Sequence, residues 1–226
     1  MRILTELVKN IFVQRDAMRV YEPGVDTKKV LNVGGGSKST PIPSYYSSWE
    51  HHLLDIDPKG RPDLVCDARE LTTLPGGGYD AIYCSHNLEH YYRHHAASVV
   101  SGFSHMLNAN GFAEVRVPDI AAVIKAVLEQ GLELDDVLYQ SAAGPISAHD
   151  VLYGYQVEIV ESGKDYYAHK TGFTPNSLIR LLREGGFQHV FLHSDEYLGI
   201  HAMAFKTAPT SEQRALLEPA WNLSMD

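Results

Sequence analysis

The chain has 226 residues, of which 44% are hydrophobic and 21% are charged. This is enough for one well-buried core, and the composition excludes a disordered or low-complexity protein. The formal net charge is −9 with histidine neutral, and the sequence contains no cluster of Lys and Arg. A polyanion would meet mostly repulsion, so we expect no nucleic-acid partner.

The sequence predicts a cytoplasmic protein with no membrane partner. Residues 1–13 have apolar side chains at helical spacing, but charged residues interrupt them, unlike the apolar centre of a signal peptide. No stretch approaches the roughly 18 apolar residues that a membrane span needs. The cysteines Cys66 and Cys84 lie in apolar runs typical of strands. We therefore expect buried free thiols in a reducing compartment.

In chain order, the apolar runs after residue 28 show strand and helix patterns in alternation. The first run is rich in β-branched residues and opens directly into Gly34–Gly36. Further short runs end at Pro or polar residues, and one helix carries apolar residues at three- and four-residue steps. The predicted elements are strands at 29–33, 52–57, 63–66, 80–85 and 112–117, a helix at 92–107 and a turn at Asn108–Gly111. This alternation predicts a parallel sheet with right-handed crossovers.

The pattern changes after the fifth strand. A helix near 120–130 precedes a segment rich in Tyr, His and Gly, and we interpret 119–170 as an insertion over the sheet edge. Regular structure resumes where Thr174-Pro175 opens a helix that Gly185-Gly186 ends. Two last strands, close enough in sequence for a hairpin, are predicted at 189–192 and 201–205.

Residues that follow the strands are the candidates for chemistry, because open parallel sheets bind ligands outside the carboxyl ends of their strands. Gly34–Gly36 would let the backbone approach a ligand, since glycine has no Cβ and tolerates positive φ. About 20 residues further on, Asp55 stands where an acid accepts the hydroxyl protons of an adenosine ribose. Asp67 and Ala68 follow the third strand, where a carboxylate would face the adenine amino group. The pattern points to an adenosine-containing cofactor.

This series of motifs resembles the class I S-adenosylmethionine-dependent methyltransferases, particularly their small-molecule, type 11-like branch. Members of that branch read like LNVGCG, D-x-D, D-A-x-x-L, S-x-x-L-E-H, L-x-x-G-G and V-P-D. The corresponding stretches here are 31–36, 55–57, 67–71, 85–90, 107–111 and 117–119, with a late pattern from His169 to Phe187. The resemblance extends from Val30 to Phe205.

The resemblance implies a Rossmann-like, doubly wound α/β fold. The expected sheet is mostly parallel and seven-stranded, with a C-terminal antiparallel hairpin and a lid inserted after strand five. We expect one methyltransferase domain over 1–226, with an N-terminal helix and lead-in at 1–28 and the lid, or substrate-binding insertion, at 119–170.

The resemblance also implies where S-adenosylmethionine is held. Gly34–Gly36 would pass under its methionine part, Asp55 would hold the ribose, and Asp67 would border the adenine. His86 would lie beside the sulfonium. One departure is Asn32, which stands where many relatives carry an acidic residue. The implied cofactor-binding set is Asn32, Gly34, Gly35, Gly36, Asp55, Ile56, Asp67, Ala68, Ser85 and His86.

Methyl transfer from this donor chiefly requires alignment of the acceptor and exclusion of water. If the acceptor is a hydroxyl, a histidine near neutral pKa is a suitable base. Our candidate catalytic bases are His86, His90 and His169. The acidic chain favours a small polar or sugar-like acceptor, and the oligomeric state is not predicted.

Three other functions fit parts of the pattern. His86-x-x-Glu89-His90 matches the motif of the inverted zinc peptidases, but that motif belongs inside a helix, and we predict no metal site. A nicotinamide dehydrogenase also needs a glycine loop and a later acid, yet G-x-G-x-x-G fails at Ser39. A non-catalytic module that binds an adenosine cofactor would keep the same fold. We predict an enzyme, an S-adenosylmethionine-dependent methyltransferase, and keep the non-catalytic module and a zinc-dependent hydrolase as alternatives.

Overall fold

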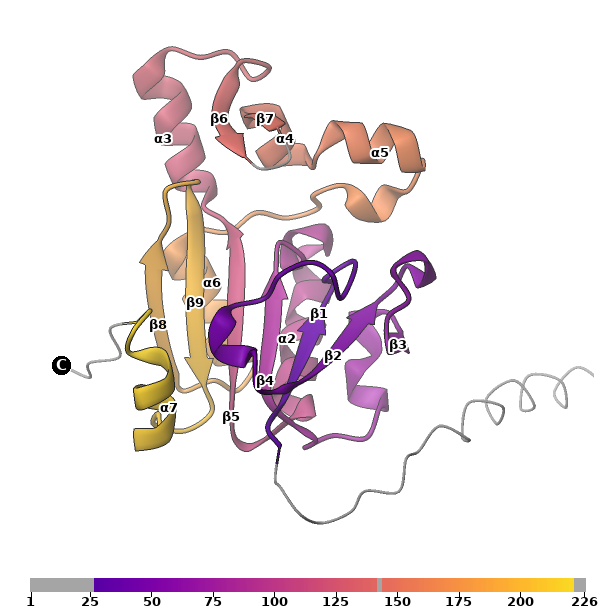
Figure 1. The fold of residues 1–226 in the computed structure, drawn as a ribbon. Coiled ribbons are helices and arrows are strands. Elements are labelled where there is room, and N and C mark those ends of the chain that lie inside the picture. The colour runs from indigo at the N-terminus through magenta and orange to yellow at the C-terminus, as the bar shows by residue number, and fades with distance from the viewer. Residues whose placement is uncertain (1–26, 142–143, 222–226) are drawn as a thin grey trace, which may run out of the picture.

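The chain builds one central β-sheet with helices on both faces, as the computed structural model in Figure 1 shows. The structure describes residues 27–141 and 144–221, so the helix predicted for 1–13 lies outside the described residues. The sheet has seven strands in the order β3-β2-β1-β4-β5-β9-β8. Strands β1 to β5 run parallel, and β9 runs antiparallel to both β5 and β8. The predicted sheet and its C-terminal hairpin are therefore confirmed.

The strands follow the predicted apolar runs closely, except at the start of β5. Their bounds are β1 Lys29–Val33, β2 Glu50–Asp55, β3 Leu64–Val65, β4 Tyr79–Ser85, β5 Leu107–Pro118, β8 His189–Ser194 and β9 Gly199–Phe205. The helices outside the lid are α2 Arg93–Met106, α6 Pro175–Glu184 and α7 Ser211–Leu217. Single turns of 3-10 helix lie at η2 Ser44–Tyr46, η3 Pro58–Gly60 and η5 Leu88–His90, and η4 Ala68–Thr73 is longer.

Strand β1 is the middle of the parallel part of the sheet. Leu31 pairs with His52 of β2 on one side and with Ile82 of β4 on the other. Residues 30–33 are at most 2% exposed. A parallel strand that is covered on both faces must be apolar almost throughout, which explains why this run reads as continuous rather than alternating.

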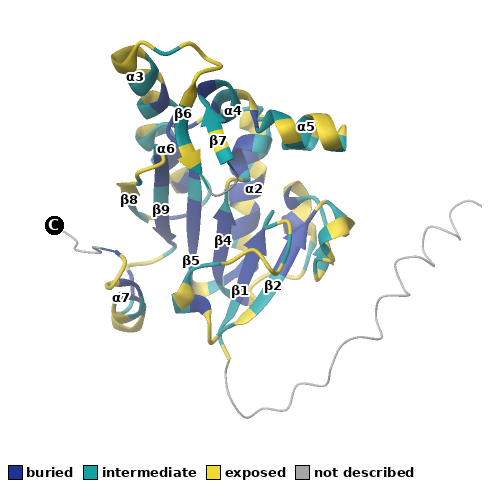
Figure 2. Cartoon of the chain, turned by 45° about the horizontal axis from the view of Figure 1, so that its top comes forward, coloured by how far each residue is buried: buried dark blue, intermediate teal, exposed yellow. Residues whose placement is uncertain are grey.

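Each face of the sheet has its own core, which Figure 2 shows as dark blue strands beneath the helices. On one face, α2 and α6 pack against Leu31, Ile82 and other strand residues. On the opposite face, Tyr46 and Leu217, from η2 and α7, pack against Phe112 and neighbouring residues. The helix α7 was not predicted from the sequence. Both faces are closed to solvent, so ligands must enter at an end of the sheet.

Helix α6 begins and ends where the sequence predicts. The Thr174 side chain accepts a hydrogen bond from the Ser177 backbone N–H, Pro175 stands at the first helical turn, and Gly185 caps the end. Within 4 Å of an ideal Cβ on Gly185, the nearest atom is Val100 Cγ1 of α2, at 2.3 Å. The two helices therefore approach each other closely at this residue.

The turn predicted at Asn108–Gly111 is wrong, because these residues are part of strand β5. Leu107 pairs with Tyr79 and Phe112 pairs with Ala81, and the register shifts between the two pairs. The extra residues form a bulge in which Asn108 donates a hydrogen bond to the Asp80 side chain at 2.9 Å. Its polar side chain is satisfied inside the sheet, so the polar run does not end the strand.

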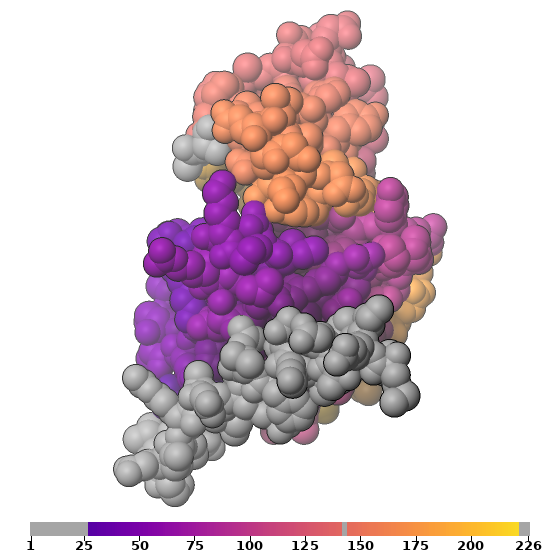
Figure 3. All heavy atoms as spheres, turned by 90° about the vertical axis from the view of Figure 1, so that its right-hand side faces the viewer, coloured from indigo at the N-terminus to yellow at the C-terminus, as the bar shows by residue number. Residues whose placement is uncertain are grey.

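The insertion after strand five, which we call the lid (119–170), lies over the carboxyl ends of the strands (Figure 1). The space-filling view shows its orange residues resting on the purple strand ends (Figure 3). A small core of its own, centred on Val123, Ala148 and Val151, holds it together. Its elements are α3 Ile120–Gln130, β6 Val137–Ser141, β7 Gly144–Ser147, α4 Ala148–Tyr153, α5 Gln156–Ser162 and η6 Asp165–Tyr167. Only α3 was predicted individually.

Two further expectations concern the cysteines and the membrane. Both cysteines are free thiols; Cys84 is buried in β4, whereas Cys66 is only half-buried just beyond β3. Among the described residues, no helix combines the length and the apolar character needed to cross a bilayer.

Replacing Phe103 by Ala tests the packing of α2 on the sheet. The Phe103 side chain is fully buried, so its loss should lower the free energy of unfolding by about 3–5 kcal/mol. Leu128→Ala is the matched control, because Leu128 is 75% exposed on α3 and should change that free energy by less than about 0.5 kcal/mol. Urea unfolding followed by circular dichroism measures both. Equal effects of the two substitutions would contradict this packing.

Candidate functional site

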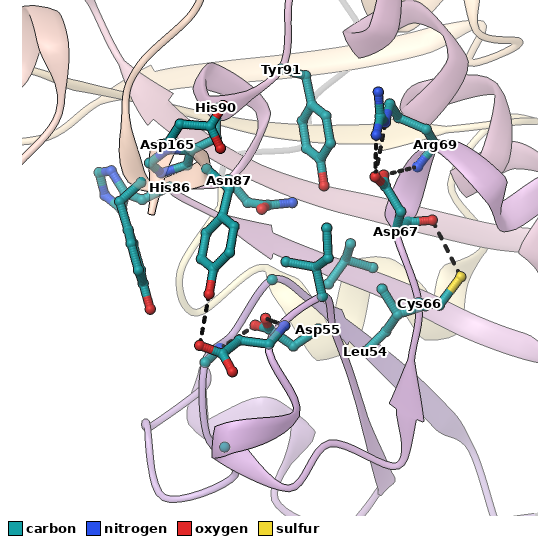
Figure 4. Close-up of a pocket in the computed structure, with 18 of the residues that line it drawn as sticks. Leu54, Asp55, Cys66, Asp67, Arg69, His86, Asn87, His90, Tyr91 and Asp165 are labelled. Carbon is teal, nitrogen blue, oxygen red and sulfur yellow. Dashed lines mark hydrogen bonds and ion pairs between the residues drawn. The ribbon is translucent and has the colours of Figure 1, made fainter. Parts of the chain in front are cut away.

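A cavity of about 780 Å³ opens where the carboxyl ends of β1 to β4 meet the lid. In Figure 4, Asp55 lies at the bottom of this cavity, Asp67 and Arg69 at the right, and His86 at the left. Tyr91 and Asn87 point into the space between them. Pockets of this size hold drug-sized ligands.

The glycine bend after β1 forms one wall. Gly34 and Gly36 have φ of +74° and +67°, a conformation that favours glycine. The Gly34 N–H donates to the Leu54 carbonyl at 2.8 Å, which ties the bend to β2. An ideal Cβ on Gly34 would lie 2.3 Å from the Asn87 side chain. The backbone therefore passes close to the residues that follow β4, and a larger residue would not fit.

Asp55 is directed at this bend. Its Oδ2 accepts a hydrogen bond from the Gly36 N–H, and its Oδ1 accepts one from the Asp57 N–H, both at 2.9 Å. The side chain lines the cavity although Asp55 is only 8% exposed. Each carboxylate oxygen can accept about two hydrogen bonds, so Asp55 keeps capacity for a ligand.

Asp67 lies at the far end of the cavity and is paired with Arg69. The guanidinium donates to Asp67 Oδ2 from Nε at 2.9 Å and from Nη2 at 2.6 Å. Burial works to raise the pKa of Asp67, but the hydrogen bonds from Arg69 outweigh burial, and the pKa is lowered. Asp67 is therefore a carboxylate with an immediate cationic partner.

The structure brings together part of the predicted cofactor-binding set. Gly34, Gly36, Asp55, Ile56, Asp67 and His86 line the cavity. Asn32, Gly35, Ala68 and Ser85 are not among its lining residues. Asn32 is buried behind the bend, with its side chain against Gly35. Asn32 therefore supports the glycine bend from behind, and the backbone of the bend, not the Asn32 side chain, lines the cavity.

Several lining residues were missed by the sequence analysis. Asn87 and Tyr91 lie in the segment between β4 and α2, so their position after a strand was a usable signal. Tyr166 comes from the lid and donates a hydrogen bond to Asp57 Oδ2 at 2.8 Å, across 109 residues of chain. No local pattern predicts such a contact. This hydrogen bond joins the lid to the loop after β2.

A second pocket of about 290 Å³ adjoins the first. His86 and His90 line both pockets and stand at their junction. The remaining wall includes Asp150 and His169 of the lid and Asp195 after β8. This pocket is small, and its wall is mostly apolar, with several polar groups set into it.

His86 has an unusual backbone conformation for a residue other than glycine. Its φ is +49°, directly after β4, and its side chain is 61% exposed. Nδ1 lies 3.4 Å from Glu89 Oε1. Although desolvation of the ring disfavours the imidazolium, the negative charge of the nearby Glu89 outweighs it and raises the pKa of His86. Strained backbone of this kind is found preferentially at functional sites.

Glu89, His90 and His169 form a cluster beside His86. The His90 and His169 rings are in edge contact, with centroids 4.8 Å apart. The pKa of His90 is lowered because burial outweighs the attraction of Glu89. The three candidate bases of the sequence analysis, His86, His90 and His169, thus line one pocket, and the structure brings His169 there from the lid.

The H-x-x-E-H segment does not have the geometry of a peptidase helix. His86 lies in the left-handed region, and Leu88–His90 is a single 3-10 turn. Helix α2 starts only at Arg93. His86 and His90 are therefore not one turn apart on a helix, as that zinc motif requires.

His201 of β9 supplies a pH-dependent contact at the wall of the smaller pocket. Its Nε2 lies 2.8 Å from Asp195 Oδ2. Burial and the charge of Arg116 outweigh Asp195 and lower the pKa of His201 to about 4. The folded state therefore prefers neutral His201, and the resulting stability is present above pH 6.5 and is lost as the pH falls through about 4.

Imidazole NMR spectra recorded between pH 7 and 3.5 test this assignment. The His201 signal, identified by its loss in His201→Asn, should stay in the neutral position at pH 5, where an ordinary histidine is protonated. The stability of the wild type, measured by urea unfolding, should also fall more steeply below pH 6.5 than that of His201→Asn. A His201 signal that titrates above pH 6 would contradict the assignment.

The fold has a counterpart among solved structures. A solved structure of an S-adenosylmethionine-dependent methyltransferase from Archaeoglobus fulgidus has a TM-score of 0.50 to this chain at 15% identity, covering 80% of this chain and 87% of the other. A methyltransferase from Thermotoga maritima, described as a possible histamine N-methyltransferase, has a TM-score of 0.48 at 10% identity, covering 81% and 84%.

Sequence comparison adds no relative. No protein-family model matches the chain, and no curated protein sequence matches it. The likeness to the Archaeoglobus fulgidus structure therefore rests on tertiary structure, and it shows that this chain shares the fold of that protein.

Proposed function

We propose that this protein transfers a methyl group from S-adenosylmethionine to a small polar acceptor. The observation that carries the proposal is the cavity at the carboxyl ends of β1 to β4. Gly34, Asp55 and Asp67 all line this one cavity, in a fold that a known methyltransferase shares. Proteins with this sheet topology catalyse several kinds of reaction, so the positions of these residues, and not the fold alone, support methyl transfer.

The lining residues fit the donor. The bend at Gly34–Gly36 has no side chain that would fill the space for a methionine backbone. Asp55 keeps free acceptor capacity for ribose hydroxyls, since each of its oxygens takes one backbone N–H. Asp67 and Tyr91 border the part of the cavity that would take the adenine. The volume of about 780 Å³ is large enough for a ligand of this size.

The smaller pocket is the proposed acceptor site. It meets the donor cavity at His86 and His90, so an acceptor there would lie beside the reacting end of the donor. A space of about 290 Å³ suits a small molecule, and Asp150 and Asp195 offer acceptors for its hydroxyl or amino groups. The net charge of −9 disfavours a nucleic acid in this place.

S-adenosylmethionine supplies a methyl group that its positive sulfur already activates. The protein then has to hold the acceptor in line and exclude water. The lid excludes water, and the hydrogen bond from Tyr166 to Asp57 holds the lid in place. His86 is the proposed base: Glu89 lies beside Nδ1, so Nε2 is the atom that takes the acceptor proton.

Calorimetry with S-adenosylhomocysteine tests the donor site. The wild type should bind it, and Gly34→Ala should weaken binding by at least about tenfold, or about 1.4 kcal/mol, because the new Cβ collides with Asn87 at the bend. Gly77→Ala is the matched control: Gly77 has the same φ of +74°, but a Cβ there meets no atom within 4 Å. It should carry only the backbone strain and bind like the wild type.

The same titration distinguishes the other classes of protein. A wild type that ignores both S-adenosylmethionine and S-adenosylhomocysteine, or that binds NAD instead, overturns the proposal. If Gly34→Ala and Gly77→Ala bind S-adenosylhomocysteine equally well, the donor does not bind at the glycine bend.

A methyl-transfer assay tests the role of His86. With a radiolabelled donor and a panel of small hydroxylated acceptors, His86→Ala should lower kcat by about 100-fold, the usual contribution of a positioned base. His94→Ala is the control, because His94 is exposed on α2 and lines neither pocket. Full turnover by His86→Ala would remove His86 from the mechanism.

A further inference from the structure

The Glu89 carboxylate lacks the partners that a buried charge needs. Glu89 is 1% exposed, and within the described residues neither Oε1 nor Oε2 takes part in a hydrogen bond. Among the described residues, the one ionisable side chain within ion-pair distance is His86, whose Nδ1 lies 3.4 Å from Oε1. A buried carboxylate is costly unless it is paired and hydrogen-bonded, or binds a metal. Oε2 therefore needs a further partner, such as a cation or a hydrogen-bond donor.

Two imidazoles lie close to this carboxylate, and a backbone carbonyl orients each of them. His90 Nδ1 lies 3.3 Å from the Ala168 carbonyl, and His169 Nδ1 lies 2.8 Å from the Val151 carbonyl. A carbonyl only accepts, so each Nδ1 carries the proton and each Nε2 keeps its lone pair. Histidines that ligate metals are oriented in this way by backbone or carboxylate partners.

We propose that Glu89, His90 and His169 bind a divalent transition-metal ion. Their ligand atoms all lie within 4.8 Å of one another, and in the described chain no other group of three or more such side chains meets this criterion. Two neutral imidazoles and one carboxylate suit Zn²⁺, Co²⁺, Mn²⁺ or Fe²⁺, whereas Mg²⁺ and Ca²⁺ prefer oxygen ligands. The prediction of no metal site from the sequence is replaced by this proposal.

Three protein ligands would leave coordination positions open for a further ligand. Two of the three ligands, His90 and His169, line the smaller pocket. The metal would therefore meet an acceptor there. This role rests on the proposed function, whereas metal binding itself does not. An acceptor hydroxyl on the ion would lose its proton to His86, and its oxygen would form a bond to the methyl carbon as the bond from that carbon to the donor sulfur breaks. S-adenosylhomocysteine would leave with the electron pair of that bond, and the oxidation state of the metal would not change.

The site also explains how the lid is positioned. Glu89 and His90 follow β4, whereas His169 stands at the end of the lid. The backbone N–H groups of Lys170 and Thr171 donate to the Glu89 carbonyl at 2.7 and 3.2 Å, so the two segments already meet at this point. A metal ion would fix the last turn of the lid to the sheet.

Metal titration of the full chain tests the proposal. After EDTA treatment and desalting, Zn²⁺ is followed by calorimetry and Co²⁺ by its visible absorption, which reports the geometry of the ligands. The wild type should bind one ion. Glu89→Gln and His169→Gln should each weaken binding at least about tenfold, because each removes one of three ligands. His94→Ala is the matched control for surface histidines, and it should bind like the wild type.

A thermal melt separates loss of a ligand from loss of the fold. Zn²⁺ should raise the Tm of the wild type and of His94→Ala, since a ligand that binds the folded state stabilises it, and should leave the Tm of the other two variants unchanged. Each variant should still bind S-adenosylhomocysteine, which shows that its fold is intact. Equal zinc affinity in the wild type, Glu89→Gln and His169→Gln would overturn the metal site, whatever the donor titration gives.

Discussion

The parallel pairing of β1 with β2 and β4 is the constraint on which the rest of this molecule depends. Because these strands run in one direction, their carboxyl ends, and the loops that carry Gly34, Asp55 and His86, all emerge at one edge of the sheet. The sheet is covered on both faces, so this edge is where a ligand can reach the strands. The hydrogen bond from the Gly36 N–H to Asp55 then fixes the bend against the neighbouring strand.

The lid adds what the sheet edge lacks. It covers the strand ends, contributes Tyr166 to the larger cavity, and brings His169 to the smaller one. Its own core is small, so its position depends on contacts with the loops below, such as the hydrogen bond from Tyr166 to Asp57. A lid held by a few polar contacts can open for ligands and still exclude water when closed.

The junction of the two pockets concentrates the unusual physical chemistry of the protein. Within a few residues after β4 the chain carries a histidine with positive φ and a buried carboxylate without hydrogen bonds, at His86 and Glu89. Features that disfavour folding in this way occur preferentially at functional sites, and His86 lines both pockets. The proposed acceptor and metal sites follow from this one short segment and the lid residue opposite it.

The sequence by itself determined the mostly parallel sheet, the glycine bend and the position of Asp55 at the end of a strand, because these depend on local patterns and on short spacings along the chain. Only the tertiary structure decided that Asn108 lies in a bulge, that Asn32 supports the bend from behind, and that His169 meets Glu89. Such contacts join residues far apart in the chain, and side-chain hydrogen bonds or burial set them, so no local pattern records them.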